Sequence, residues 1–582
     1  MTATTPTLDP FLVGVIANRL VSTLNEQQAT LVNTAFSTIV RESLDLACGV
    51  FDTRGEMIAQ SASGTPGHIN AMATGVRHVL DRLPVAELEP GDVLITNDPW
   101  MTTGQLHDIT IATPVFRAGG LVGLFASTCH AADIGGRGLS GEAREVFEEG
   151  LLIPPMKLVR AGAPNEDLLA ILRGNVRTPE ETVGDVYAQA AANETGARSL
   201  IALLDEVGLD SLDEVAAEII ARSERAMREA IADLPNGRYE AEVASDGFDE
   251  PVALRVTVTI EDEDVHLDFS GSAPQSPFGI NCVLNYTHAY ASFAMKAAVA
   301  PDVPHNAGSF RPVLVTAPEG SILNCRPPAS VASRHVIGHM LPGLIFAALA
   351  PAMPSRVLAG SADSLWCTLW RGADRAGERF AQTVFKAGGV GARASKDGLS
   401  TVGFPTGVGA VPTEVIETLT PLVNRHRGLR ADAGGAGRWR GGLGQVLEME
   451  CRSPRSWSVS ALVDRTRFAA HGEAGGRPGA TGEAWVGDDP LPTKRQVWLD
   501  PGARVTVRTP GGGGWGDPHD REPERVLADV VAGYVTLDAA REEYAVAIDY
   551  RGTPDALVRL PEDYVIDRAE TARLRGNGGI QA

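Results

Sequence analysis

The sequence is poor in several residues and patterns that mark large classes of protein. Only five of its 582 residues are lysine, aromatic residues make up 5%, and cysteine occurs six times. The 51 basic residues are outnumbered by 73 acidic ones, which gives a formal net charge of -22. Such a charge repels nucleic-acid phosphates and anionic membrane surfaces. We therefore expect no nucleic-acid partner and no membrane partner.

The cysteines and the apolar stretches bear on the cellular compartment. The cysteines form no Cys-x-x-Cys pair and none of the dense spacings of a zinc ribbon or a disulfide framework. The N-terminal residues lack the basic segment and the small-residue cleavage site of a secretory signal. The most apolar stretch, 336–353, is interrupted by His339, Pro342 and Pro351, and it predicts a buried core helix rather than a membrane span. These features predict a cytoplasmic protein with reduced thiols.

The pattern of apolar residues predicts an alternation of helical and sheet regions. Apolar spacing indicates a long helix or a helix pair over 9–45, short strands over 48–59 and 92–134, and helices over 166–233. A Leu-Pro-Asn-Gly-Arg turn ends this part, and alternating strands follow over 239–269. Helical patterns resume near 289–300 and 336–349, glycine dominates from 380 to 516, and two short helices are expected over 522–544.

These patterns lead to a prediction of the fold class. The chain is far longer than the roughly 250 to 300 residues at which a single core stops growing. We predict a mixed α/β (α+β) protein of several subdomains, with largely antiparallel sheets and a helical N-terminal region. The expected divisions are a helical and sheet region at 1–235, a central α+β region at 236–379, and a glycine-rich β region with C-terminal helices at 380–582.

Several common catalytic signatures are missing. The sequence has no GxxxxGK[ST] phosphate loop, no HExxH zinc helix and no GxSxG nucleophile elbow. Gly511, Gly513 and Gly516 match GxGxxG, but Asp517-Pro518 follows directly and no helix begins there. We interpret this match as a glycine turn, and we expect no ATP chemistry from this chain alone.

Potential metal ligands are concentrated in two neighbouring segments, 97–108 and 129–136. The first contains Asn97, Asp98, Gln105, His107 and Asp108, and the second contains Cys129, His130 and Asp133. Both segments adjoin predicted strands, so their side chains can converge at the strand ends. Imidazole and carboxylate ligands with an open position suit a hydrolytic Zn²⁺ or Mn²⁺. The alternative is a pair of surface turns with incidental His and Asp side chains.

Longer motifs resemble the B subunits of the hydantoinase and oxoprolinase family, whose relatives include 5-oxoprolinase, N-methylhydantoinases and the acetone and acetophenone carboxylases. The resemblance runs nearly end to end. It includes RESLD at 41–45, FDTRG at 51–55, NDP at 97–99, DITIATPVF at 108–116, DIGG at 133–136, EGLLIPP at 149–155, DFSG at 268–271, RWRGGLG at 438–444 and TPGGGGWGDP at 509–518.

The resemblance implies a set of metal ligands. In this family a His-x-x-Asp pair and a later His hold the metal, and these positions fall on Gln105, Asp108 and His130. Gln105 differs from the family pattern, which has His at this position, and a neutral amide is a weaker Zn²⁺ ligand than imidazole. His107 is the alternative ligand. Asp133 is expected to orient His130, to be a fourth ligand, or to act as a base on the attacking water.

Other polar residues have both a catalytic and a structural interpretation. Family members suggest that Glu42 and Asp45 line the site, although a solvated helix end is the alternative for both. His68 is predicted to hydrogen-bond substrate, or else to have a capping role. Arg334 and His335 are predicted to bind a carboxylate or imide oxygen of the substrate, with a structural ion pair as the alternative. Cys129 lacks an identified base and is interpreted as a small buried residue.

The resemblance also implies a function and a partner. In such enzymes an A-type subunit with an actin-like ATP-binding fold phosphorylates the substrate carbonyl, and the B-type subunit completes the reaction. We expect the metal-bearing B subunit of a hetero-oligomeric cyclic amide hydrolase, acting on a hydantoin, 5-oxoproline or a related lactam. The alternatives are the equivalent subunit of an ATP-dependent ketone carboxylase and a non-catalytic scaffold subunit.

Overall fold

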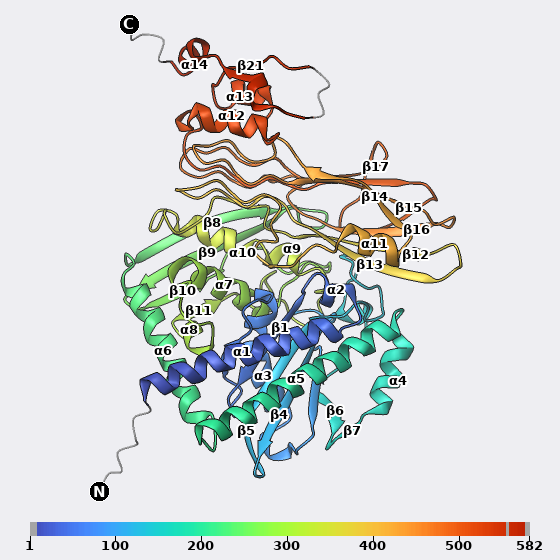
Figure 1. The fold of residues 1–582 in the computed structure, drawn as a ribbon. Coiled ribbons are helices and arrows are strands. Elements are labelled where there is room, and N and C mark those ends of the chain that lie inside the picture. Colours follow the sequence, from blue (N-terminus) through green and yellow to red (C-terminus); the bar gives the residue numbers. More distant parts are fainter. Residues whose placement is uncertain (1–8, 554–557, 577–582) are drawn as a thin grey trace.

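The computed structural model describes residues 9–553 and 558–576, and Figure 1 shows its arrangement. N-terminal elements form the lower part of this view, two sheets of the later chain lie above them, and a small helical unit from the C-terminal region lies at the top. Helices accompany several mostly antiparallel sheets, so the predicted fold class is confirmed. Within the described part of the chain, no helix has the length and apolar character needed to cross a bilayer.

The N-terminal region is built on a seven-stranded antiparallel sheet with the order β2-β1-β5-β4-β3-β6-β7. Its strands are β1 (Leu46–Phe51), β2 (Met57–Gln60), β3 (Val93–Thr96), β4 (Asp108–Arg117), β5 (Gly120–His130), β6 (Met156–Arg160) and β7 (Ala163–Pro164).

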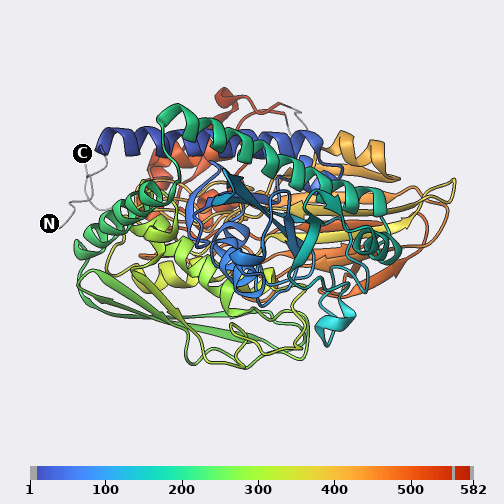
Figure 2. The ribbon, with the colours of Figure 1, turned by 90° about the horizontal axis from the view of Figure 1, so that it is seen from below.

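Helices cover both faces of this sheet. Helices α1 (Pro10–Thr34) and α5 (Pro179–Val207) lie side by side on one face, as Figures 1 and 2 show, and α3 (Pro66–Arg82) covers the other. Successive residues of β5 point to opposite faces: Phe125 packs with α1 and α5, and Leu124 packs with α3. The helix pair predicted over 9–45 is confirmed as α1 and α2 (Thr38–Arg41).

The central region begins after the predicted turn. Helices α4 (Glu166–Asn175), α5 and α6 (Asp213–Ala232) precede it, and the predicted boundary at 235/236 lies between α6 and β8. A four-stranded sheet of order β11-β10-β9-β8 follows, in which only the β10–β11 pair is parallel. Its elements are β8 (Gly237–Ser245), β9 (Val252–Glu261), β10 (Asp264–Asp268), α7 (Leu284–Val299), α8 (Ala307–Phe310), β11 (Val313–Thr316), α9 (His335–Gly338) and α10 (Leu341–Leu349).

Two further sheets pack face to face around the buried indoles of Trp366, Trp370 and Trp457. The predicted boundary at 379/380 falls inside the β12–β13 hairpin of the first sheet. One sheet contains β12 (Trp366–Ala373), β13 (Arg379–Lys386), β16 (Trp457–Leu462) and β19 (Gln496–Leu499). The other contains β14 (Leu422–Leu429), β15 (Gln445–Cys451), β17 (Glu483–Val486), β18 (Asp489–Pro490) and β20 (Arg504–Arg508).

The glycine-rich segments are not surface turns. Stretches from around 360, 390, 442 and 513 lie side by side and exchange backbone hydrogen bonds, such as Gly442 N to Val390 O at 2.8 Å and Gly512 N to Gly442 O at 2.9 Å. A Cβ atom on Gly512 would lie 2.3 Å from the Val390 oxygen, so these backbones can approach so closely only at glycine. We call this set of segments the glycine layer. The GxGxxG match belongs to it and precedes no helix of a dinucleotide-binding unit.

The C-terminal unit has a small core of its own around Val526, Val530 and Tyr544. The helices predicted over 522–544 are confirmed as α12 and α13. The unit contains α12 (Pro523–Val531), α13 (Leu537–Glu542), β21 (Ile548–Tyr550), β22 (Tyr564–Ile566) and α14 (Arg568–Leu574).

Candidate active site

Two predicted ligands meet because β4 begins where β5 ends. Asp108 is the first residue of β4 and His130 is the last of β5, and they are register partners in the antiparallel pair. His130 Nδ1 lies 3.0 Å from Asp108 Oδ1. Both side chains are buried. The predicted convergence of the two segments is therefore present in the structure.

Gln105 completes a triangle with these two residues. Its Nε2 lies 2.7 Å from Asp108 Oδ1 and 2.9 Å from His130 Nδ1. The loop that carries Gln105 is fixed by Asn97, whose side-chain amide donates to Leu106 O and Leu151 O. His107 lies outside the triangle, and its ring stacks on the His130 ring with the centroids 5.2 Å apart. Of these two residues, Gln105 is the one whose side chain contacts both Asp108 and His130.

The second carboxylate oxygen of Asp108 binds two more side chains. Arg334 Nη2 donates to Oδ2 at 2.6 Å, and His68 Nε2 lies 3.0 Å from it. Burial raises the pKa of Asp108, but the charges of His68 and Arg334 outweigh it and hold that pKa well below its usual value. Burial likewise lowers the pKa of His68, but Asp108 and Asp45 outweigh it and raise that pKa above its usual value. The site thus holds an ionised carboxylate beside an imidazole with an increased tendency to be protonated.

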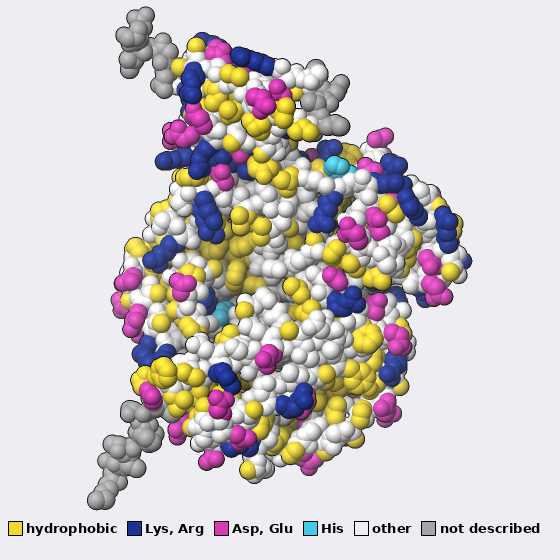
Figure 3. Space-filling model, viewed as in Figure 1, with side chains coloured by type: hydrophobic (Ala, Val, Ile, Leu, Met, Phe, Trp, Pro, Cys, Tyr) yellow, Lys and Arg dark blue, Asp and Glu magenta, His cyan; other side chains and the backbone are white. Residues whose placement is uncertain are grey.

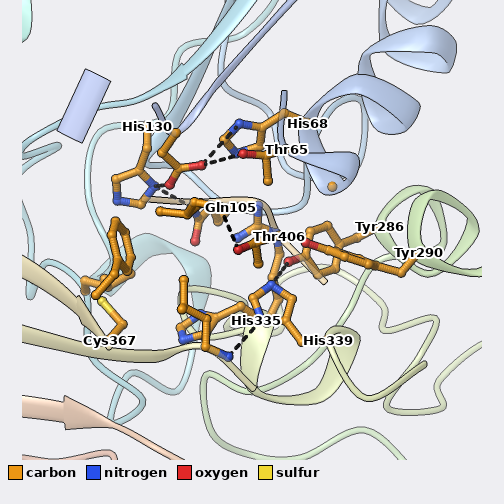
Figure 4. A pocket seen from close by; sticks show the side chains of 17 residues that line it. Thr65, His68, Gln105, His130, Tyr286, Tyr290, His335, His339, Cys367 and Thr406 are labelled. Carbon is orange, nitrogen blue, oxygen red and sulfur yellow. Dashed lines mark hydrogen bonds and ion pairs between the residues drawn. The ribbon is translucent and has the colours of Figure 1, made fainter. Parts of the chain in front are cut away.

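These residues form one wall of a cavity with an empty volume of about 450 Å³. Figure 4 shows His68, Gln105 and His130 on one side, with His335, His339 and Tyr286 opposite them. The wall near His68 also contains Asp45, which accepts a hydrogen bond from Thr65 Oγ1 at 3.1 Å. The other lining residues come from distant parts of the chain: Gly67, Leu139, Tyr290, Leu365, Cys367, Phe385, Thr406 and Val408.

The opposite wall presents neutral hydrogen-bonding groups. Leu365 N donates to His339 Nδ1 at 3.3 Å, so His339 Nε2 carries the proton and donates to the Tyr286 hydroxyl at 3.2 Å. Burial lowers the pKa of His335 to about 3 and that of His339 well below its ordinary value, which keeps both rings neutral. His335 Nε2 is buried and has no hydrogen-bond partner within residues 9–553 and 558–576, which leaves it available to a ligand.

Arg334 connects the two walls. Its guanidinium stacks on the Tyr286 ring at 4.0 Å, and its Nε donates to Thr103 O at 2.6 Å. Gly104 allows this approach, because a Cβ atom there would lie 2.9 Å from Arg334 Cδ. The structure thus contains the ion pair that sequence analysis gave as the alternative, and substrate binding by Arg334 stays a prediction.

Two predicted catalytic residues lie away from the cavity lining. Asp133 accepts hydrogen bonds from Arg177, at 2.5 Å from its backbone N and 2.8 Å from Nη1, and no hydrogen bond connects it to His130 among the described residues. Glu42 ends α2, is partly exposed, and pairs with Arg41 at 3.4 Å. Cys129 is buried, and burial raises its pKa well above the usual value, which disfavours a nucleophilic thiolate.

Comparisons with known proteins place the chain in a family. A model of the hydantoinase B/oxoprolinase family matches residues 9–518. The chain belongs to this family. An uncharacterized protein of Methanocaldococcus jannaschii is 34% identical over 98% of this chain and all of its own length. The caprolactamase subunit beta of Pseudomonas jessenii is 31% identical and covers 94% of this chain and 98% of its own.

Two solved structures share the fold of this family member. The ATP-dependent caprolactamase of Pseudomonas jessenii superimposes with a TM-score of 0.87 at 28% identity, over 98% of this chain and 100% of the matched chain. Nucleotide-free acetone carboxylase superimposes with a TM-score of 0.88 at 20% identity, over 98% of this chain and 83% of the matched chain.

The residues at the triangle fit a divalent cation on one condition. Among the described residues, His, Cys, Asp and Glu alone provide no group of three that could hold a metal, so a metal at this triangle would need the Gln105 amide as a third ligand. The Gln105 Oε1 atom is buried and has no hydrogen-bond partner in the described part of the chain. Rotating the amide would bring this oxygen toward Asp108 and His130 in place of the nitrogen. A ligand set of one amide oxygen, one carboxylate oxygen and one imidazole suits Mn²⁺ better than it suits a metal that prefers thiolate ligands.

Sequence analysis missed most of the second wall. Tyr286, His339 and Thr406 belong to none of the motifs considered, and His339 was interpreted only as an interruption of an apolar stretch. One signal was available: His335 and His339 are four residues apart, a spacing that places two side chains on one helical face.

Proposed function

We propose that this chain is the B subunit of an ATP-dependent cyclic amide hydrolase, which opens a hydantoin, 5-oxoproline or a related lactam after a partner subunit phosphorylates the ring carbonyl. Membership of the hydantoinase B/oxoprolinase family supports this reaction class. The observation that carries the proposal is the cavity itself. There, His68 and His130, which both bind ionised Asp108, face the neutral side chains of Tyr286 and His335. This arrangement suits a polar ring whose carbonyl accepts hydrogen bonds.

The charged wall is suited to proton transfer. His68 carries its proton more readily than an ordinary histidine, and its Nδ1 faces Asp45 Oδ1 at 3.6 Å. We assign His68 to donate a proton to the ring nitrogen as the C–N bond breaks. Asp108 holds the His68 ring through Nε2, which fixes its orientation.

The neutral wall is suited to binding the substrate. His339 donates to the Tyr286 oxygen, so the Tyr286 proton remains available to an acceptor in the cavity. Together with His335 Nε2, it would orient the oxygen atoms on the reacting carbon. Burial of these groups strengthens their hydrogen bonds, because few waters compete with the substrate.

A divalent metal, Zn²⁺ or Mn²⁺, would be held by Gln105, Asp108 and His130, where it would supply a Lewis acid and lower the pKa of a bound water. The chain's own contribution is to arrange these three donors within 3.0 Å of one another. Asp108 also keeps Arg334 and His68 beside them.

We further propose that an A-type subunit with an ATP-binding site performs the phosphorylation in a hetero-oligomer. The sequence has no phosphate loop, and a matched relative is itself named as a subunit, caprolactamase subunit beta. Carboxylation of a ketone is the alternative reaction. Its support is the fold shared with acetone carboxylase at 20% identity. A shared fold does not distinguish carboxylation from amide hydrolysis.

The test measures ring opening by chromatography with hydantoin, 5-oxoproline and caprolactam. The chain and its co-encoded A-type partner are assayed separately and together, with and without ATP. We expect product only when chain, partner and ATP are combined, and a large loss with His130→Ala, while Arg160→Gln, an exposed control, keeps full activity. Ring opening by the single chain without ATP would overturn the proposal, and so would full activity of His130→Ala.

A further inference from the structure

A second pocket, lined by arginine side chains, lies beside the candidate active site. The segment 137–142 contributes to both, because Leu139 lines the first cavity while Ser140 and Glu142 line the second. Strand β12 also serves both, through Cys367 in one and Arg371 in the other. The second pocket is open and has an empty volume of about 1210 Å³. We call it the arginine pocket after Arg137, Arg177, Arg371, Arg379 and Arg455.

The arginine pocket has more positive than negative charge. The whole chain has a net charge of -22, and on the face drawn in Figure 3 acidic and basic side chains are interspersed. In the pocket, however, Arg379 and Arg455 are exposed and have no carboxylate within 4.0 Å among the residues described. Glu142 is the only acidic residue in the lining, and its Oε2 already accepts a hydrogen bond from Gln496 N at 2.9 Å.

The base of the pocket contains two guanidiniums that share one carboxylate. Asp133 Oδ1 lies 2.8 Å from Arg177 Nη1 and 4.0 Å from Arg371 Nη2. Arg371 Nη1 donates to Arg137 O at 2.9 Å, but its Nε is buried and no described residue offers it an acceptor. Burial and the charge of Arg177 lower the pKa of Arg371 to about 10, which shows how incompletely this charge is compensated. A bound anion would accept a hydrogen bond from Arg371 Nε and would balance the positive charge of the two guanidinium groups.

We propose that the arginine pocket binds a small molecule that carries a phosphate group. Planar guanidinium groups match phosphate oxygens in pairs, and several of them converge here from different elements. Trp498, 66% exposed, and Phe380 form an apolar side of the same pocket, which would accommodate an organic part of the ligand. Asp133 then has a structural role as the anchor of Arg177 and Arg371.

Isothermal titration of the purified full chain at low ionic strength tests this proposal. The probes are inorganic phosphate, pyrophosphate and phenyl phosphate. We compare the native chain with a double variant, Arg379→Gln with Arg455→Gln, whose exposed side chains can be replaced without disturbing the core. The matched control is Arg160→Gln, an exposed arginine outside the pocket that has no carboxylate partner among the described residues.

We expect saturable binding that weakens with added salt and is about tenfold weaker or more for each arginine removed, with no change for the control. Trp498→Ala should weaken phenyl phosphate alone if the ligand is an organic phosphate, and equal binding of phosphate and phenyl phosphate would indicate an inorganic one. Absence of saturable binding to every probe would overturn the proposal, as would equal affinities of the double variant and the native chain. Neither outcome depends on amide hydrolysis, so the proposed function is tested separately.

Discussion

Replacing the buried Lys386 should stabilise the protein in a manner that depends on pH. Lys386 lies in β13, is 1% exposed, and donates to Thr368 Oγ1 and Val384 O. Burial lowers its pKa from 10.5 to about 7. Between these values the native state binds fewer protons than the unfolded state, so stability rises as the pH increases from about 7 to about 10.5. Below pH 7 the charged amine is a constant penalty.

The magnitude follows from the difference between 10.5 and about 7, which corresponds to about 5 kcal/mol at 1.36 kcal/mol per pH unit. Lys386→Met should therefore be more stable than the native chain by up to about this amount at pH 6.5, and the difference should shrink to about 1 kcal/mol near pH 10. Thr368 remains satisfied in the variant, because its hydroxyl still accepts from Trp370 Nε1 at 2.9 Å and donates to Val384 O at 3.2 Å.

Denaturant unfolding of both chains from pH 6 to pH 10 gives this difference directly. Lys396→Met removes an exposed lysine and is the matched control, expected to show no pH-dependent change. A stability difference between Lys386→Met and the native chain that stays constant across this range would refute the reasoning. A variant that is less stable than the native chain at pH 6.5 would refute it as well.

Three further predictions concern the site and its surroundings. Gln105→His should bring bound transition metal closer to one ion per chain and His130→Ala should remove it, which elemental analysis measures; equal metal content in all chains would contradict the predicted ligands. Arg334→Met should lower the free energy of unfolding by about 3–5 kcal/mol, because it leaves the buried Asp108 carboxylate without its guanidinium; unchanged denaturation would contradict this ion pair. Burial raises the pKa of Glu149 from 4.5 to about 7, so native stability should fall as the pH rises between these values. Glu149→Gln should flatten that dependence in a thermal melt series, and an equally steep slope would count against it.

The parts of the fold that follow local patterns could be predicted from the sequence. The apolar residues of 9–45 predicted a long helix or a helix pair, and the long helix α1 buries one continuous stripe of them against the sheet. Asp108 and His130 were predicted to converge because both lie at strand ends, which antiparallel pairing then brings opposite each other. Family membership was predicted from motifs and is confirmed.

Other features depend on contacts that no local pattern encodes. The second wall comes from Tyr286 and His339, more than 150 residues after His130, and only tertiary packing brings them to it. Asp133 was expected to orient His130, to be a fourth ligand or to act as a base, whereas in the structure its carboxylate binds Arg177, 44 residues later in the chain. The predicted boundary at 379/380 relied on composition, whereas hydrogen bonding joins the strands on either side of it.

The glycine layer also has a consequence for the order of folding. Its hydrogen bonds join segments as far apart as Gly360 and Gly513. Because glycine has no apolar side chain, each of these segments offers little apolar surface with which to collapse by itself. Closing loops of this length lowers the chain entropy before any stabilising contact has formed. Contacts between residues so distant in sequence therefore slow folding. Leu365 and Cys367, which line the cavity, follow Gly360 by only a few residues. The candidate active-site cavity should therefore be completed late, after its charged wall has already formed within the N-terminal sheet.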